Sequence, residues 1–138
     1  MNVLIIDGQG GNLGKMLTRR LKEAVPQADI TAVGTNSTAT EKMLKGGADR
    51  AATGENAVIV NARRARIIAG PLGIIIADAL LGEVTPVMAM AVGQSDAVRV
   101  LIPMNRCDTL VAGVGEKAMG ELIEDGVKKI LSCLSQKD

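Results

Sequence analysis

The stretch VLIIDGQGGNLGK, residues 3–15, decides the fold expected for this chain. Residues 3–6 are a continuous apolar run, which is typical of a strand buried on both faces of a parallel sheet. A glycine-rich turn follows, and from Leu13 onward apolar residues recur at helical spacing until Pro26 ends the pattern. A buried strand that leads through glycines into a helix predicts the first unit of a Rossmann-like α/β fold.

Strand-like and helix-like stretches alternate along the rest of the chain. Further strands are expected near residues 30–34, 48–53, 66–70 and 98–102, with a sixth, antiparallel edge strand at 109–113. Helices are expected near residues 36–45, 57–65, 85–93 and 119–134, with one or two buried helical turns at 74–81. Residues 58–60 would suit a strand equally well. The alternation predicts a single domain, residues 1–138, with a doubly wound, mostly parallel sheet of five to six strands and helices on both faces.

Composition excludes several classes of function. Among 138 residues there is no His, Phe, Tyr or Trp, and the net charge is only +1. Imidazole catalysis and stacking of nucleic-acid bases are therefore excluded, and without a basic cluster we expect no nucleic-acid partner. No apolar run reaches the ~18 residues of a membrane span, and no signal peptide is evident, so we expect a cytoplasmic protein without a membrane partner.

Sulfur-containing residues point to packing rather than chemistry. Cys107 and Cys133 lie far apart in the sequence, so we expect reduced thiols and no disulfide. Six of the seven methionines, all but Met1, are expected to fill a core that has no aromatic rings, and we expect no metal site. Such a core buries little area per residue, which favours an apolar subunit interface through residues 74–81 and the helix after Pro86. We therefore expect a homodimer.

The glycine-rich turn carries the strongest chemical signal. Its glycines follow the pattern GxxGxxG, in which the first allows a tight turn, the second lets the backbone approach a pyrophosphate, and the third lets helix and strand pack closely. The start of the helix offers free N–H groups to an anion. The candidate phosphate-binding residues are Gly8, Gln9, Gly10, Gly11, Asn12, Leu13, Gly14 and Lys15. A tight turn without a ligand is the alternative, whereas a P-loop is excluded because Met16 replaces its Ser or Thr.

Polar residues also gather at the ends of the other expected strands, which share one crevice in a doubly wound sheet. The further candidate ligand contacts are Thr35, Asn36, Glu55, Asn56, Gly70, Pro71, Asn105 and Arg106.

Several of these side chains allow two interpretations. Arg106 either contacts an anion or is solvated, and Cys107 beside it is either reactive or a small buried group. Glu55 either contacts a ribose or stabilises the helix dipole. Asp7 either touches a ligand or ties down the backbone of the turn. Glu83 is interpreted as part of a loop that enters a helix.

The turn resembles the GxxGxxG loop of dihydrodipicolinate reductases and of extended short-chain dehydrogenases, over residues 1–20 only. That resemblance implies a nucleotide pyrophosphate over residues 9–13 and NADP or NAD as the cofactor. Two features depart from it: residues 34–37, GTNS, contain neither an acidic residue for an NAD ribose nor an Arg for the 2′-phosphate of NADP.

The whole chain is similar to a small uncharacterised bacterial family of Rossmann-like proteins, a domain of unknown function. The matching stretches are residues 7–11, 34–36, 53–57, 70–73, 81–86 and 102–107. This resemblance implies the fold and assigns no activity, so catalytic residues stay unknown. Three hypotheses remain: a nucleotide-binding protein of unknown reaction, a non-catalytic sensor or partner-binding module that uses the same crevice, and a subunit whose active site is completed by another chain.

Overall fold

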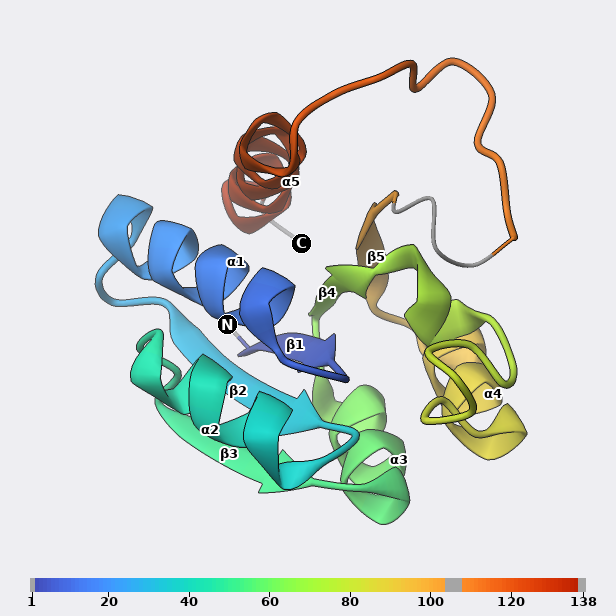
Figure 1. Ribbon diagram of the computed structural model, residues 1–138. Helices are drawn as coiled ribbons and strands as arrows, with labels where there is room; N and C mark the ends of the chain where they lie inside the picture. Colours follow the sequence, from blue (N-terminus) through green and yellow to red (C-terminus); the bar gives the residue numbers. More distant parts are fainter. Residues whose placement is uncertain (1, 104–107, 137–138) are drawn as a thin grey trace.

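Five parallel strands form one sheet in the order β3-β2-β1-β4-β5 in the computed structural model, which describes residues 2–103 and 108–136 (Figure 1). The strands are β1 Asn2–Asp7, β2 Asp29–Gly34, β3 Arg50–Thr53, β4 Ile67–Pro71 and β5 Val98–Ile102. The helices are α1 Asn12–Ala24, α2 Ser37–Lys45, α3 Glu55–Arg64, α4 Pro86–Gln94 and α5 Met119–Leu134, with a 3-10 helix, η1, at Leu72–Ile75. The expected α/β fold is confirmed, with every pairing in the sheet parallel.

Strand order reverses between β1 and β4. From β1 the chain adds β2 and then β3 on one side, and afterwards it returns to place β4 and β5 on the other. In doubly wound sheets, ligands bind outside the carboxyl ends of the strands at such a reversal. The turn that follows β1 therefore begins at the position where a crevice is expected.

Alternate residues of β1 face opposite helical layers, which explains why its sequence is continuously apolar. Val3 and Ile5 pack with α1, α2 and α5, whereas Leu4 and Ile6 pack with α3 and α4 (Figure 1). All four side chains are buried. A strand covered on both faces has no solvent side on which a polar residue would be stable.

The prediction of a sixth strand at residues 109–113 is wrong. These residues form turns and irregular backbone in the described part of the chain. Leu110 is 91% exposed, and φ is positive at Asp108 and Gly113. The segment therefore has neither a buried face nor the extended backbone of a strand.

The structure also tests the predictions for residues 58–60 and 74–81. Residues 58–60 lie inside α3, so the helical interpretation is confirmed over the strand. Residues 74–81 form helical structure only at their start, in η1, and then turn through Asp78, Leu80 and Leu81, whose φ values are 67°, 57° and 56°. Leu81 is 96% exposed, so the expected continuous burial of this segment is wrong.

No helix among residues 2–103 and 108–136 is long and apolar enough to cross a membrane.

Candidate anion-binding site at the turn between β1 and α1

The turn after β1 is closed by its own backbone. The Gly11 amide donates to the Gly8 carbonyl over 3.0 Å, and the chain enters α1 through Gly11 with φ at 78°. Gln9 also has a positive φ, 49°. Successive N–H groups of a turn that contains such left-handed residues can form a concavity that suits an anion.

Three of the glycines are required by packing. A Cβ at Gly8 would lie 2.5 Å from Thr35 Oγ1, and one at Gly11 would lie 2.6 Å from Ala39 Cα of α2. At Gly14 it would lie 2.8 Å from Asp7 Cβ. The third glycine thus lets helix and strand approach as expected, and the second lets the turn pack closely on α2.

Gly10 differs from these three glycines. It is exposed, and a Cβ there would meet only Asn12 Nδ2, at 3.9 Å. Gly10 is therefore the position at which the turn faces open space.

Asp7 ties down the backbone of the turn, which confirms one of its two interpretations. One carboxylate oxygen accepts the Gly8 amide at 2.8 Å and the other accepts the Gly14 amide at 2.7 Å. Burial raises the pKa of Asp7 above its ordinary value; these two hydrogen bonds oppose that shift, and the negative charge of Glu83 adds to it.

Glu83 holds the turn from the opposite side, although it lies 74 residues away in the sequence. Its Oε1 accepts hydrogen bonds from the Gln9 amide at 2.8 Å, Thr35 Oγ1 at 2.6 Å and Asn36 Nδ2 at 2.8 Å. Burial raises the pKa of Glu83, but the hydrogen bonds from Thr35, Gln9 and Asn36 outweigh burial, so the pKa lies below its ordinary value. Sequence reasoning missed this role, because nothing local to residue 83 indicates a contact with the first turn.

Three backbone amides of the turn have no acceptor among the described residues. The amides of Gly8, Gln9, Gly11, Gly14 and Lys15 all donate to carboxylates or carbonyls of the chain. No such bond exists for Gly10, Asn12 or Leu13. The last two are the first residues of α1, where the helix has its partial positive charge.

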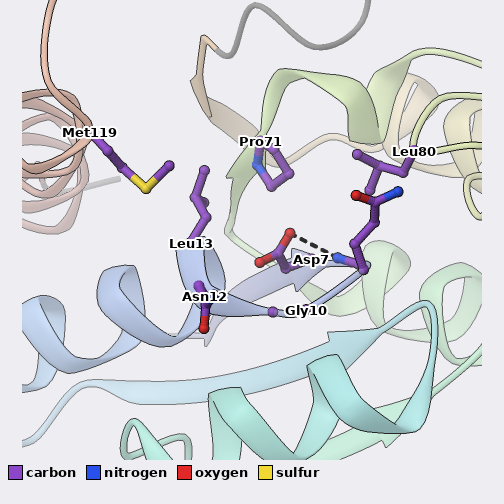
Figure 2. Close-up of a pocket in the computed structure, with 10 residues that line it drawn as sticks. Asp7, Gly10, Asn12, Leu13, Pro71, Leu80 and Met119 are labelled. Carbon is purple, nitrogen blue, oxygen red and sulfur yellow. Dashed lines mark hydrogen bonds between the residues drawn. The ribbon is translucent and has the colours of Figure 1, made fainter.

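These three residues line a cavity of about 210 Å³ at the reversal between β1 and β4 (Figure 2). Figure 2 shows the glycine turn below the opening, with Met119 of α5 and Leu80 on opposite sides and Pro71 between them. The lining residues are Asp7, Gly8, Gln9, Gly10, Gly11, Asn12, Leu13, Pro71, Leu80 and Met119. Leu80 and Met119 were not anticipated, because each comes from a segment far from the turn in sequence.

The other candidate residues fall into four groups, two beside the turn or in the sheet, one away from the cavity and one outside the described residues. Thr35 and Asn36 adjoin the turn through Glu83, and Asn36 Nδ2 also donates to the Gln9 carbonyl at 3.0 Å. Gly70 packs against the Ile6 carbonyl too closely for any Cβ, so its role is in the sheet.

Lys15, Glu55 and Asn56 do not line the cavity. The aliphatic stem of Lys15 lies beside Gly46, at the end of α2. Glu55 accepts a hydrogen bond from Thr85 Oγ1 at 2.6 Å, and Asn56 is exposed. Asn105, Arg106 and Cys107 lie outside the described residues.

The chemistry of the cavity is that of backbone donors. In the part of the chain that the structure describes, Asp7 is the only ionisable side chain that lines it, and both of its oxygens are already hydrogen-bonded. Among the residues that the structure describes, no group of three or more His, Cys, Asp or Glu side chains could hold a metal ion.

Residues 2–135 match the family described as Domain of unknown function (DUF3842), so the chain belongs to this family. No curated protein matches the sequence. The fold is similar to that of the dodecameric FMN-dependent UbiX-like decarboxylase from Escherichia coli O157:H7, with a TM-score of 0.49, 14% sequence identity, and coverage of 100% of this chain and 96% of that chain. At this distance, FMN and the dodecamer are properties of that protein alone.

Proposed function

We propose that the turn between β1 and α1 binds the phosphate group of a nucleotide ligand. The observation that carries this proposal is a set of three amides, those of Gly10, Asn12 and Leu13, which have no acceptor within residues 2–103 and 108–136 and line one cavity at the reversal of strand order. Unpaired N–H groups at the start of a helix attract an anion through both hydrogen bonding and the helix dipole. The exposed Gly10 leaves space for the phosphate to approach the backbone.

The size of the cavity limits which part of the ligand enters it. Its volume of about 210 Å³ is below the roughly 300 Å³ at which pockets for drug-sized ligands begin. A phosphate group fits with part of the ligand, and the rest of an NAD- or NADP-like dinucleotide would lie along the surface of the sheet edge.

Isothermal titration calorimetry with inorganic pyrophosphate, ATP, FAD, NAD and NADP tests the proposal. A ligand present at a hundred times its dissociation constant should also raise stability by roughly 2.7 kcal/mol, which a thermal melt detects. Gly10→Asp should abolish binding by placing a carboxylate in the opening, whereas Gly10→Asn has nearly the same shape without the charge and should retain most of it. Gly93→Asp, at an exposed glycine of α4, controls for net charge. Absence of heat from every one of these ligands at millimolar concentration would overturn the proposal.

The second candidate function is a non-catalytic sensor or partner-binding module that uses the same site. It is favoured by the commitment of both Asp7 oxygens to the backbone, since a proton-transfer role would first have to break these bonds. Turnover measurements on ligand-bound protein separate the two candidates: consumption of a bound nucleotide or a hydride acceptor would contradict the module.

We also propose that the chain forms a homodimer. Exposed apolar side chains in the expected interface support this: Ile75, Leu81, Val87 and Met90, with exposed fractions of 37%, 96%, 40% and 53%. All four come from the two segments expected to form the interface, and exposed apolar surface is a feature of interaction sites. Sedimentation at micromolar concentration should give twice the 14.3 kDa of one chain, and a species of 14.3 kDa alone would contradict the dimer.

A further inference from the structure

Glu83 places a carboxylate where a nucleotide-binding α/β protein needs an acidic group. In such folds an Asp or Glu at the end of the second strand accepts hydrogen bonds from the ribose of the ligand. The end of β2 in this chain offers only Thr35 and Asn36, which are not acidic. Glu83 reaches this position from the loop before α4 and is fixed there by hydrogen bonds from both residues.

One oxygen of Glu83 is free to bind a ligand. All three of its hydrogen bonds go to Oε1, and Oε2 accepts none from any described residue. Oε2 is also reached by solvent. Among the described residues, Asn2 Oδ1 is the only side-chain polar atom that is both buried and without a hydrogen-bond partner, so Oε2, which has no partner, is not buried. The Oε1 contacts hold the carboxylate in one orientation, so that Oε2 is a positioned acceptor.

This acceptor lies close to the proposed phosphate site. Glu83 Oε1 is 2.8 Å from the Gln9 nitrogen, and the next amide along the chain is that of Gly10. Consecutive Cα atoms are about 3.8 Å apart. Glu83 Oε1 therefore lies within roughly 7 Å of the Gly10 nitrogen, so the ribose of a nucleotide whose phosphate binds at Gly10 comes within reach of this carboxylate.

We propose that Glu83 Oε2 accepts hydrogen bonds from the 2′ and 3′ hydroxyls of the ligand, and so selects a ribonucleotide that carries no 2′-phosphate. This inference rests on the proposed function. A 2′-phosphate would lie against a carboxylate of the same charge, and residues 34–37 offer no cation to compensate. The site therefore prefers NAD or a simple ribonucleotide to NADP.

Calorimetric titration of the full chain with matched ligand pairs tests the inference. ATP and 2′,3′-dideoxy-ATP carry the same phosphates and differ only in the hydroxyls, while NAD and NADP differ in the 2′-phosphate. We expect the wild type to bind ATP roughly tenfold more tightly than dideoxy-ATP, because hydrogen bonds to a charged acceptor are lost. NAD should bind more tightly than NADP.

Glu83→Gln should reduce both ratios to about two- to threefold, because a neutral acceptor makes weaker hydrogen bonds and repels no phosphate. Glu41→Gln, at an exposed residue of α2, removes the same charge elsewhere and should keep the wild-type ratios. If Glu83→Gln fails to fold, the wild-type affinity ratios of ATP to dideoxy-ATP and of NAD to NADP still test whether the site recognises the ribose hydroxyls.

The outcomes separate the two proposals. If pyrophosphate and every nucleotide fail to bind, the phosphate site itself is wrong. If ATP and dideoxy-ATP bind the wild type equally, the phosphate site stands and the ribose role of Glu83 is overturned. If Glu83→Gln increases the affinity for ATP and for dideoxy-ATP equally, the ribose role of Glu83 is also overturned, because the carboxylate would then only repel the phosphates.

Discussion

Two glycine-containing turns lead from a strand into a helix at the same edge of the sheet, and only the first lines the cavity described above. The turn between β1 and α1 is tightly packed except at Gly10: glycines 8, 11 and 14 have no room for a Cβ, and Asp7 is buried beneath them. The turn between β3 and α3 is open. A Cβ at Gly54 would meet nothing within 4 Å, and Thr53 and Glu55 on either side are exposed.

Both turns use a glycine with positive φ, so the conformation of a single residue does not distinguish them. Gly11 has φ at 78° and Gly54 has φ at 103°. The difference lies in sheet position and in long-range contacts: β1 is central and next to the reversal, whereas β3 is an edge strand. A carboxylate from the distant residue Glu83 fixes the first turn. A glycine turn becomes a candidate site here because of what surrounds it.

The largest expected effect is the difference in stability lost when the acidic residue of each turn, Asp7 or Glu55, is replaced by Ala. Asp7→Ala leaves the Gly8 and Gly14 amides without their acceptor in a buried position, and should lower the free energy of unfolding by about 2–4 kcal/mol. Glu55→Ala, at the exposed start of α3, should cost only about 0.3–1 kcal/mol through the helix dipole. Urea midpoints at constant m-value measure both. Equal losses would remove the distinction between the turns.

A methyl group at Gly14 should have the next largest effect. Gly14→Ala places a Cβ 2.8 Å from Asp7 Cβ and 2.7 Å from Met43 Sδ, so overpacking should cost about 1–3 kcal/mol. The matched control is Gly93→Ala in α4, where a Cβ meets nothing within 4 Å and helix propensity should add roughly 0.5–1 kcal/mol. Thermal or urea unfolding measures both variants. If both were more stable than the wild type, the first turn would not be tightly packed.

The smallest effect concerns Glu83 and depends on pH. Because hydrogen bonds lower its pKa in the folded state, the unfolded chain binds more protons near the ordinary pKa of glutamate, and stability from Glu83 increases with pH there. The wild type should exceed Glu83→Gln by about 0.5–1.5 kcal/mol above that range, and the advantage should disappear as the pH falls through the folded value.

The pH dependence is read from the difference between the wild type and Glu83→Gln, because Asp7 titrates in both proteins and its raised pKa includes a contribution from the Glu83 charge. The raised pKa of Asp7 acts with the opposite sign, because its contribution is present at low pH and is lost as the pH rises. An advantage of the wild type that grows toward acid pH would contradict the role of Glu83.

Local patterns were enough to predict most of the fold. Residues 3–6 and the helical spacing from Leu13 are signals within one element, and the structure has β1 and α1 there. The sixth strand failed for a different reason: residues 109–113 have a suitable composition, but a strand also needs a partner, which composition does not encode.

The candidate site was predictable only in part. The glycine turn itself was found from its spacing, and Pro71 from its place at a strand end. Glu83, Leu80 and Met119 come to the turn through tertiary structure, and their local sequence carries no sign of it. Lys15 illustrates the converse, because a charge in the first turn of a helix suggested a phosphate contact while the side chain stem lies toward α2.

The most direct test follows the backbone amides themselves by nuclear magnetic resonance of the nitrogen-15-labelled protein during titration with pyrophosphate. We predict that the amide signals of Gly10, Asn12 and Leu13 shift most, while those of Gly54 and Glu55 in the second turn stay in place. No shift at Gly10, Asn12 and Leu13 at millimolar pyrophosphate, or equal shifts at both turns, would contradict a phosphate site between β1 and α1.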